Sequence, residues 1–198
     1  MAAKPAVALQ RYAELAGEYD ASCQRMEPIR VRTIAALNLR RGDVVIDVCA
    51  GTGLSFAQIE ARIGPSGRII AIEQSPHMMR VARNRAAAGG FSNITFVPAA
   101  VQDACIPALA DAILFNYTHD VLQSHAALAN VFEHAHPGAR VAVSGTKFFP
   151  WWLAPLNLFV ALRSWRYLTT FEGITKPYQN LLDYVHCWEM ENRFGGMG

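Results

Sequence analysis

The chain has 198 residues, of which 52% are hydrophobic and 17% are charged, and its formal net charge is +2. This length suits a single domain with one core, and this composition excludes an intrinsically disordered chain. The 18 basic residues are scattered along the sequence, so no nucleic-acid partner is expected.

The cysteines and the N-terminal segment indicate the cellular compartment. Cys23, Cys49, Cys105 and Cys187 show neither C-x-x-C spacing nor a matching set of histidines, so we expect no disulfide framework and no metal site. The N-terminal segment becomes polar too early for a secretory signal and contains acids that a transit peptide avoids. We therefore expect a cytoplasmic protein. The most apolar run, 148–162, is too short to span a membrane, so only a peripheral membrane contact is considered.

Helical and strand-like patterns alternate along the chain, which is typical of βαβ units around a parallel sheet. Residues 1–40 are expected to form an N-terminal helical cap that ends with a helix at 27–37. The expected elements that follow are a strand at 44–48, a helix at 55–62, a strand at 68–73, a helix from 75 to 89, strands at 94–97 and 112–116, a helix at 124–134 and a strand at 140–144.

This regular pattern ends at Lys147. Residues 148–185 are rich in aromatic side chains and are expected to form an insertion with helices at about 156–167 and 178–185. A final strand is expected at 186–194, where apolar and polar residues alternate. The predicted fold is therefore α/β and Rossmann-like, with a doubly wound, mostly parallel sheet flanked by helices and an aromatic-rich insertion before the last strand.

A glycine turn between a strand and a helix is the main functional motif. It runs from Val44 to Ser55 with the sequence VVIDVCAGTGLS. Glycine lets a ligand approach the backbone, and the helix that follows offers free N–H groups. Glu73 ends the next strand about 20 residues after Gly53, where a carboxylate accepts both hydroxyls of a ribose. These features predict a nucleoside-containing cofactor. This sequence lacks the third glycine of the dinucleotide-binding motif Gly-x-Gly-x-x-Gly, and it contains no P-loop Gly-Lys-Ser/Thr. A dinucleotide-binding protein and a P-loop protein are therefore not indicated.

Four segments in order resemble the class I S-adenosylmethionine-dependent methyltransferases, over residues 12–146. They are Asp47–Gly53, Glu73–Met78, Val101–Asp103 and His136–Val141. The resemblance implies a single methyltransferase domain over 1–198 with S-adenosyl-L-methionine as its cofactor. The cofactor-binding residues that it implies are Tyr19, Asp47, Cys49, Ala50, Gly51, Gly53, Glu73, Gln74, Met78, Val101, Gln102, Asp103 and Asn116.

Two features depart from this family. Cys49 stands where the family has its first glycine, so we expect a wider turn with the thiol packed under it; a catalytic thiol is the alternative. The family also has a seventh, antiparallel strand, whereas only two residues follow Gly196. We therefore expect either a sheet without this strand or a sequence that stops short of it, and an open sheet slot would leave an exposed edge or admit a partner strand.

The acceptor site is expected after the fourth strand, because open α/β sheets bind ligands at the carboxyl ends of their strands. The residues there, Asn116 to Asp120, do not form the Asn/Asp-Pro-Pro-aromatic loop of methyltransferases that act on nucleobases. His119 beside Asp120 is the candidate general base, since imidazole titrates near neutral pH. The alternative is that His119 only shapes the pocket. Tyr117 is a candidate substrate-binding residue.

The aromatic insertion, 148–185, is interpreted as an apolar lid over the acceptor, with Trp151 and Trp152 as substrate-binding walls. A homodimer interface or plain core is one alternative. A second is contact with a bilayer, anchored by the two tryptophans together with Arg163 and Arg166. We prefer the pocket, because prolines interrupt the run and no dense basic face accompanies it.

The sequence thus predicts a methyltransferase that transfers a methyl group to a small apolar or aromatic molecule or to a lipid headgroup. The alternative is a non-catalytic, methyltransferase-like subunit that binds the cofactor and uses its aromatic insertion as a protein interface.

Overall fold

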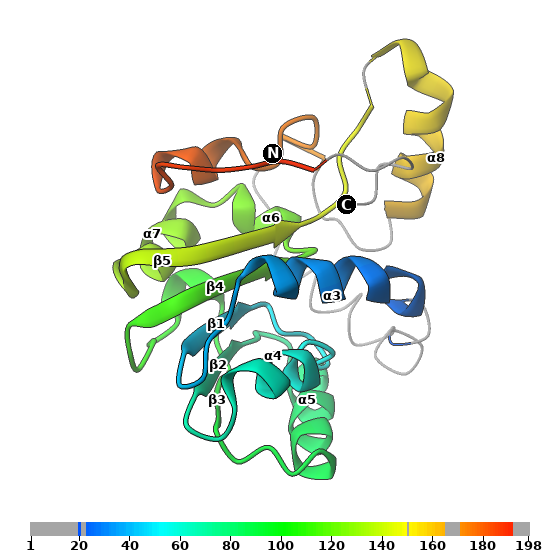
Figure 1. Cartoon of the computed structure of the whole chain (residues 1–198). Coiled ribbons are helices and arrows are strands. Elements are labelled where there is room, and N and C mark those ends of the chain that lie inside the picture. Colours follow the sequence, from blue (N-terminus) through cyan, green and yellow to red (C-terminus); the bar gives the residue numbers. More distant parts are fainter. Residues whose placement is uncertain (1–19, 21–22, 150, 165–170, 192–198) are drawn as a thin grey trace.

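A parallel β-sheet forms the centre of the molecule (Figure 1). The computed structural model describes residues 20, 23–149, 151–164 and 171–191. The strands are β1 (Val44–Val48), β2 (Arg68–Ile72), β3 (Ile94–Val97), β4 (Ala110–Asn116) and β5 (Ala135–Ser144). Their order is β3-β2-β1-β4-β5, and every neighbouring pair is parallel. The chain therefore winds outward from β1 in both directions, which confirms the predicted doubly wound α/β fold.

Helices cover both faces of this sheet. The described helices are η1 (Gln24–Met26), α3 (Glu27–Ala36), α4 (Phe56–Ile63), α5 (Pro76–Ala88), η2 (Val101–Asp103), α6 (His119–Leu122), α7 (His125–Glu133), η3 (Trp151–Leu153), α8 (Ala154–Ser164) and η4 (Gln179–Asp183), of which η3 and α8 do not contribute to the two faces. Apolar side chains of α3, α4 and α5 form one core with one face of the sheet, and those of η2, α6, α7 and η4 form a second core on the other face. The fold thus has three layers.

The central strands are apolar on both faces because each face is covered. In β1, Val45 belongs to one core and Ile46 to the other, and both are fully buried. Ile69 and Ile70 of β2 divide in the same way. Such continuous runs of β-branched residues are typical of buried parallel strands, and they explain why the sequence pattern located these two strands correctly.

Serine caps set the starts of two helices. The Ser75 hydroxyl accepts a hydrogen bond from the backbone N–H of Met78 at 3.4 Å, and Pro76 occupies the first turn of α5. The Ser124 hydroxyl accepts one from the N–H of Ala127 at 3.3 Å. Both helices begin where the sequence predicts them, because a serine cap satisfies an N–H group that the helix leaves unpaired.

Strand β5 begins earlier than the expected residue 140. It starts at Ala135, and the pairing with β4 shifts between Ala110 and Ala112. Gly138 lies in this region with φ of 82°, a conformation that favours glycine. The Pro-Gly segment therefore forms an irregular part of the strand instead of a turn before it.

The expected final strand is wrong for the residues that the structure describes. Residues 186–191 are exposed and form neither a strand nor a helix, and 192–194 lie outside the described residues. Within the described part, β5 pairs with β4 alone, so residues 186–191 do not extend the sheet. Alternation of side chains predicts a strand only where a neighbouring edge accepts its hydrogen bonds.

Helix α8 stands away from the three layers, beyond the carboxyl end of β5 (Figure 1). It begins at Ala154, two residues before the predicted start. Among the described helices, none combines the length and apolar character that crossing a bilayer requires.

Candidate functional site

A cavity of about 690 Å³ lies at the carboxyl ends of β1, β4 and β5. Asp47, Asn116 and Ser144 line it from these three strands. Further parts of its wall come from the glycine loop, η1, α3, the start of α6, the segment 145–147, part of 177–191 and two residues of α8. Ligands of open α/β sheets bind at this edge and at the point where the strand order reverses, which here lies between β1 and β4.

The glycine loop between β1 and α4 turns through left-handed backbone conformations. Cys49, Gly51 and Gly53 have φ of 55°, 58° and 77°. Gly51 lines the cavity, whereas a Cβ at Gly53 would overlap the ring of Phe56. Gly53 is therefore required for packing between the loop and α4, and Gly51 lies where its backbone is open to a ligand.

Glu73 supports this loop from the end of β2. One carboxylate oxygen, Oε2, accepts the N–H of Gly51 at 3.0 Å, and the other, Oε1, accepts the N–H of Ser75 at 2.7 Å. The side chain is buried, and it is not among the residues that line the cavity. Burial raises the pKa of Glu73, and hydrogen bonds from backbone N–H groups oppose this shift.

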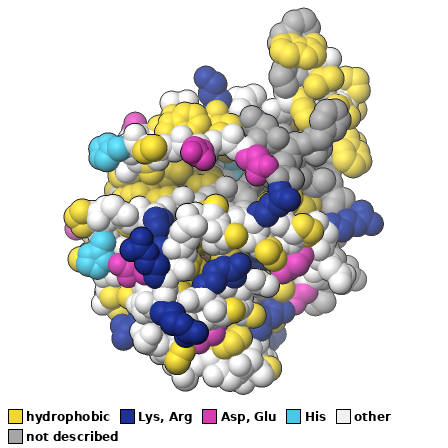
Figure 2. All heavy atoms as spheres, viewed as in Figure 1, with side chains coloured by type: hydrophobic (Ala, Val, Ile, Leu, Met, Phe, Trp, Pro, Cys, Tyr) yellow, Lys and Arg dark blue, Asp and Glu magenta, His cyan; other side chains and the backbone are white. Residues whose placement is uncertain are grey.

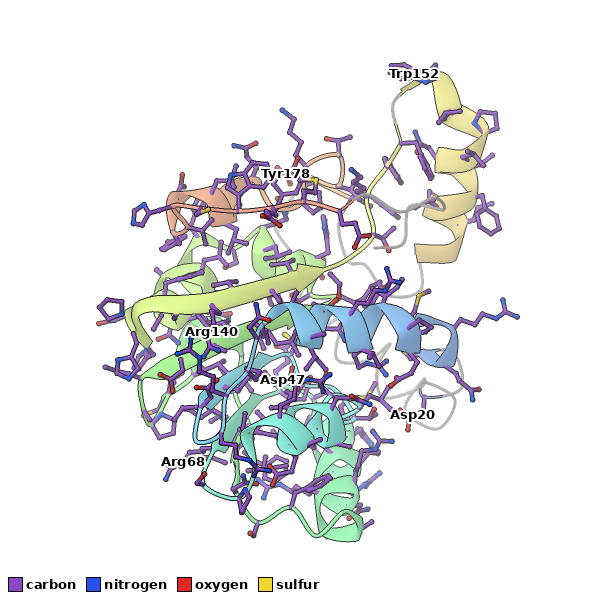
Figure 3. All side chains as sticks on the ribbon, viewed as in Figure 1. Asp20, Asp47, Arg68, Arg140, Trp152 and Tyr178 are labelled. Carbon is purple, nitrogen blue, oxygen red and sulfur yellow. The ribbon has the colours of Figure 1, made fainter. Side chains whose placement is uncertain are left out.

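Asp47 is the buried carboxylate that lines the cavity. Its side chain is 2% exposed, and its Oδ2 atom has no hydrogen-bond partner among the described residues (Figure 3). Burial raises the pKa of Asp47 to about 7; Arg30 opposes this shift and Glu73 adds to it. An oxygen that is buried without a partner is costly, so it fits a cationic or N–H donor of a ligand.

The Cys49 thiol also lines the cavity and packs against the core. Burial, followed by the carboxylates of Glu73, Asp47 and Asp120, raises the pKa of this thiol well above its ordinary value. A protonated thiol is a weak nucleophile. The surroundings of Cys49 therefore favour the packing interpretation over the catalytic one.

Asn116 and Tyr117 follow each other at the end of β4, and both line the cavity. The Asn116 Oδ1 atom accepts the hydroxyl of Ser144 at 2.5 Å, which joins β4 to β5. Tyr117 has φ of 59°, and its hydroxyl donates to Met26 Sδ at 3.3 Å. Burial raises the pKa of Tyr117 to about 12, so the phenol stays protonated at neutral pH. A left-handed tyrosine is a strained feature, and such features cluster at functional sites.

His119 lies next in the wall of the cavity, at the start of α6, and is 6% exposed. Its Nε2 atom is 3.0 Å from the carbonyl oxygen of Glu172. Because a carbonyl only accepts, the ring donates from Nε2 and its Nδ1 atom carries the lone pair. Nδ1 has no hydrogen-bond partner among the described residues. Burial lowers the pKa of His119, against the opposing effects of Asp120 and the Glu172 carbonyl, so the ring is neutral at pH 7.

The glycine loop is tied to the N-terminal cap. The Thr52 hydroxyl donates to Asp20 Oδ1 at 2.6 Å, and the Arg85 guanidinium pairs with Asp20 and donates to the Thr52 carbonyl oxygen. These contacts place Asp20 of the cap beside the loop. The resemblance implied cofactor binding for Tyr19, the residue before it in the sequence. Tyr19 itself lies outside the described residues.

Several predicted residues do not line the cavity. These are Gly53, Glu73, Gln74, Met78, Val101, Gln102, Asp103, Asp120 and Trp152. Met78 and Val101 are buried, whereas Gln102 and Asp103 are exposed. The structure thus brings together Asp47, the Cys49–Gly51 loop, Asn116, Tyr117 and His119. The contacts expected for the second and third cofactor segments stay predictions.

Trp152 does not form the pocket wall that the sequence analysis expected. Trp152 is 65% exposed and lies at the outer end of α8, far from the labelled Asp47 (Figure 3). The side chain of Trp151 lies outside what the structure describes. The aromatic content of the segment could not show which way its side chains face, since apolar residues are common on both sides of a surface helix.

Arg30 is a site residue that the sequence analysis missed. It lies on α3, is 4% exposed, lines the cavity and forms an ion pair with Glu27. Its charge also opposes the rise that burial causes in the pKa of Asp47 and of Tyr117. The spacing of Glu27 and Arg30 on one helix face was a weak signal, because such pairs are usually solvated.

The order of the parallel strands, the glycine loop after β1 and the buried acid at the end of β2 define a class of α/β proteins that bind a nucleoside-containing cofactor. Residues 39–155 match the model of a family described as a methyltransferase domain. The chain belongs to this family.

Curated relatives are also methyltransferases, and a solved structure shares the fold. A demethylmenaquinone methyltransferase of Anoxybacillus flavithermus is 25% identical over 85% of this chain and 70% of its own length. A ubiquinone/menaquinone biosynthesis C-methyltransferase of Pasteurella multocida is 29% identical over 56% of this chain and 42% of its own. A precorrin-6y C5,15-methyltransferase of Geobacter metallireducens superposes with a TM-score of 0.56 and 18% identity, over 79% of this chain and 70% of that one. The chain spans 27% to 45% of the length of several other curated relatives.

The cofactor of this family of domains is S-adenosylmethionine, and the site suits it. A cationic amino group, which this cofactor carries, would be a suitable donor for Asp47 Oδ2, since that oxygen has no hydrogen-bond partner among the described residues. The cofactor carries a positively charged sulfonium and no phosphate. A loop with a buried carboxylate beside it therefore suits the charge of the cofactor better than an anion-binding nest would.

Proposed function

We propose that this domain transfers a methyl group from S-adenosylmethionine to a small apolar acceptor, such as an aromatic ring with an ionisable hydroxyl. The observation that carries the proposal is that one cavity joins the cofactor loop to an apolar wall. Asp47 and Gly51 line one part, and Val143, Leu181 and Trp188 line another. The relatives named for menaquinone and ubiquinone biosynthesis support an apolar ring as acceptor.

Different residues of the site serve cofactor binding and proton removal from the acceptor. When bound, the cofactor supplies an electrophilic methyl group on its sulfonium. Asp47, whose Oδ2 atom has no partner among the described residues, would hold the cofactor's amino group, and Gly51 in the cavity wall would leave room for its chain. Holding both partners in one cavity replaces a bimolecular encounter by a fixed geometry.

His119 acts on the acceptor. Its neutral ring takes the acceptor's proton at Nδ1, while Nε2–H stays fixed on the Glu172 carbonyl. The proton is thus held on the imidazolium as the acceptor atom gains its methyl group. Asp120 raises the pKa of His119, which favours the imidazolium that forms.

Turnover on a panel of acceptors tests this proposal. The protein is incubated with S-adenosylmethionine and a catechol, the reduced hydroquinone form of a short-chain demethylmenaquinone analogue or phosphatidylethanolamine, and S-adenosylhomocysteine is measured. We expect release with at least one ring-hydroxyl acceptor and an acceptor mass increased by one methyl group. Binding of the cofactor without turnover on any acceptor would contradict the proposal.

We also propose a cytoplasmic location. No disulfide joins any of the four cysteines, all of which lie within the described residues, and this suits a reducing compartment.

A further inference from the structure

Helix α8 and the turn before it carry a surface of exposed apolar side chains, which we call the α8 patch. Leu158, Phe159 and Leu162 are 62%, 60% and 69% exposed, and Trp152 is 65% exposed. With Leu156, also exposed, they recur at helical spacing along one side of α8. Figure 2 shows hydrophobic atoms gathered on the part of the molecule that projects beyond the body.

Residues on the opposite side of α8 contact the protein and thereby orient the α8 patch outward. Val160 is 4% exposed. The Asn157 side chain accepts the N–H of Phe149 at 2.7 Å and donates to the Phe149 carbonyl oxygen at 3.0 Å. The helix therefore turns its amide towards the protein and its leucines outward, which is the reverse of an ordinary surface helix.

The stretch 147–171, which contains the patch and ends just before Glu172, has one sign of charge. From Lys147 to Phe171 it contains three basic side chains, Lys147, Arg163 and Arg166, and no aspartate or glutamate. Three of the chain's four tryptophans also fall in this stretch. Tryptophan and basic residues beside an apolar helix face are the composition of segments that lie in a membrane interface.

We propose that the α8 patch docks on a bilayer that contains anionic phospholipids. An anionic surface complements the basic stretch, and the apolar face enters the boundary between headgroups and chains. A symmetric dimer through the same patch would bring the basic stretches of two copies together, which like-charge repulsion disfavours.

The α8 patch also reaches the cavity. Phe159 belongs to the patch and lines the cavity, and the exposed residues Trp188 and Met190 line it from the C-terminal segment. Glu189 and Glu191 alternate with these two residues, are exposed and line the cavity as well. A docked domain would thus place Phe159, Trp188 and Met190 at the bilayer, as the apolar part of a rim through which a lipophilic acceptor enters. This route rests on the proposed function, whereas the docking itself does not.

Vesicle sedimentation tests the docking. The protein is mixed with vesicles of phosphatidylcholine alone or of phosphatidylcholine with phosphatidylglycerol. The test variant carries Trp152→Ser, Leu158→Gln and Leu162→Gln, none of which lines the cavity. The matched control is Leu109→Gln, since Leu109 is 45% exposed and lies between η2 and β4.

We expect the wild type and Leu109→Gln to sediment with the anionic vesicles and to be released by salt. The triple variant is expected to lose about tenfold or more in partitioning while it keeps its melting temperature and its affinity for S-adenosylhomocysteine. A wild type that stays in the supernatant overturns the proposal. So does a triple variant that binds vesicles equally well, or a wild-type dimer that the triple substitution dissociates when no vesicle binding occurs. The vesicle measurement needs no acceptor, so its failure leaves the proposed methyl transfer standing.

Discussion

Two carboxylates that lie on neighbouring strands of this site have different surroundings. Both oxygens of Glu73 accept backbone N–H groups, whereas Oδ2 of Asp47 has no hydrogen-bond partner in the described structure. Asp47, with the unsatisfied oxygen, lines the cavity, and Glu73 supports the glycine loop. Individual residues of the site can therefore be tested separately.

Cofactor binding is predicted to depend on pH through Asp47. Its pKa of about 7 in the free protein means that the carboxyl is largely protonated below that pH. A bound ammonium favours the ionised form, so binding releases a proton there and affinity rises with pH, by up to about tenfold per pH unit. Isothermal titration in two buffers of different ionisation enthalpy measures this proton.

The variant Asp47→Asn is expected to lose that dependence and to bind about 1.5 to 3 kcal/mol more weakly, the scale of a charged hydrogen bond. Asp183→Asn is the control and is expected to behave as the wild type, since Asp183 is exposed and does not line the cavity. An unchanged pH dependence in Asp47→Asn would assign the proton to another group.

The acid at the end of β2 is predicted to affect both stability and binding. Glu73→Ala leaves the N–H groups of Gly51 and Ser75 without their acceptors, which costs about 1 to 3 kcal/mol of unfolding free energy. If Glu73 also binds the ribose, cofactor affinity falls by a further 1.5 to 3 kcal/mol or so. Denaturation without ligand gives the first value and calorimetry the second; affinity within about twofold of wild type would refute the ribose assignment.

Turnover is predicted to depend on His119. His119→Ala is expected to lower turnover by about 10²-fold with little effect on cofactor affinity, the lower range for a positioned base. Burial lowers the pKa of His119 below its ordinary 6.5, so wild-type turnover at saturating cofactor is level at neutral pH and falls only under more acidic conditions. The exposed His125→Ala serves as control. Equal turnover in His119→Ala would leave His119 a residue that only shapes the pocket.

At the scale of elements, a single arginine connects three parts of the fold. Arg140 of β5 donates to the Leu37 carbonyl oxygen at 3.2 Å, after the end of α3, and to Asp43 Oδ2 at 2.7 Å, before β1 (Figure 3). A cation at a helix C-terminus is favourable, and the pair with Asp43 is largely shielded from water. This contact positions α3, which carries Arg30, over the sheet.

Removing this link is predicted to destabilise the fold. Arg140→Ala is expected to lower the unfolding free energy by about 1 to 2 kcal/mol, because a helix terminus and a partly buried carboxylate both lose a partner. The exposed Arg68→Ala at the start of β2 is the matched control. Urea denaturation compares the two, and equal stability would mean that Arg140 contributes no more than a surface charge.

At the scale of the whole molecule, local patterns predicted most of the fold. Strands β1 and β2 and the capped helix α5 depend on runs of neighbouring residues, and all three were located correctly. The strand expected at 186–191 was wrong, because pairing depends on a distant edge. The outward orientation of Trp152 and the burial of Arg30 also depend on residues far along the chain, which composition and spacing do not report.

Titration of S-adenosylmethionine into the wild-type protein tests the central claim most directly, namely that the cavity at the carboxyl ends of β1 and β4 holds this cofactor. We predict one site per chain with a dissociation constant in the micromolar range, comparable binding of S-adenosylhomocysteine, and marked weakening in Gly51→Val, since a branched side chain strains the left-handed turn and blocks the cavity wall. No binding of either compound at millimolar concentration, or full binding by a folded Gly51→Val, would contradict the account.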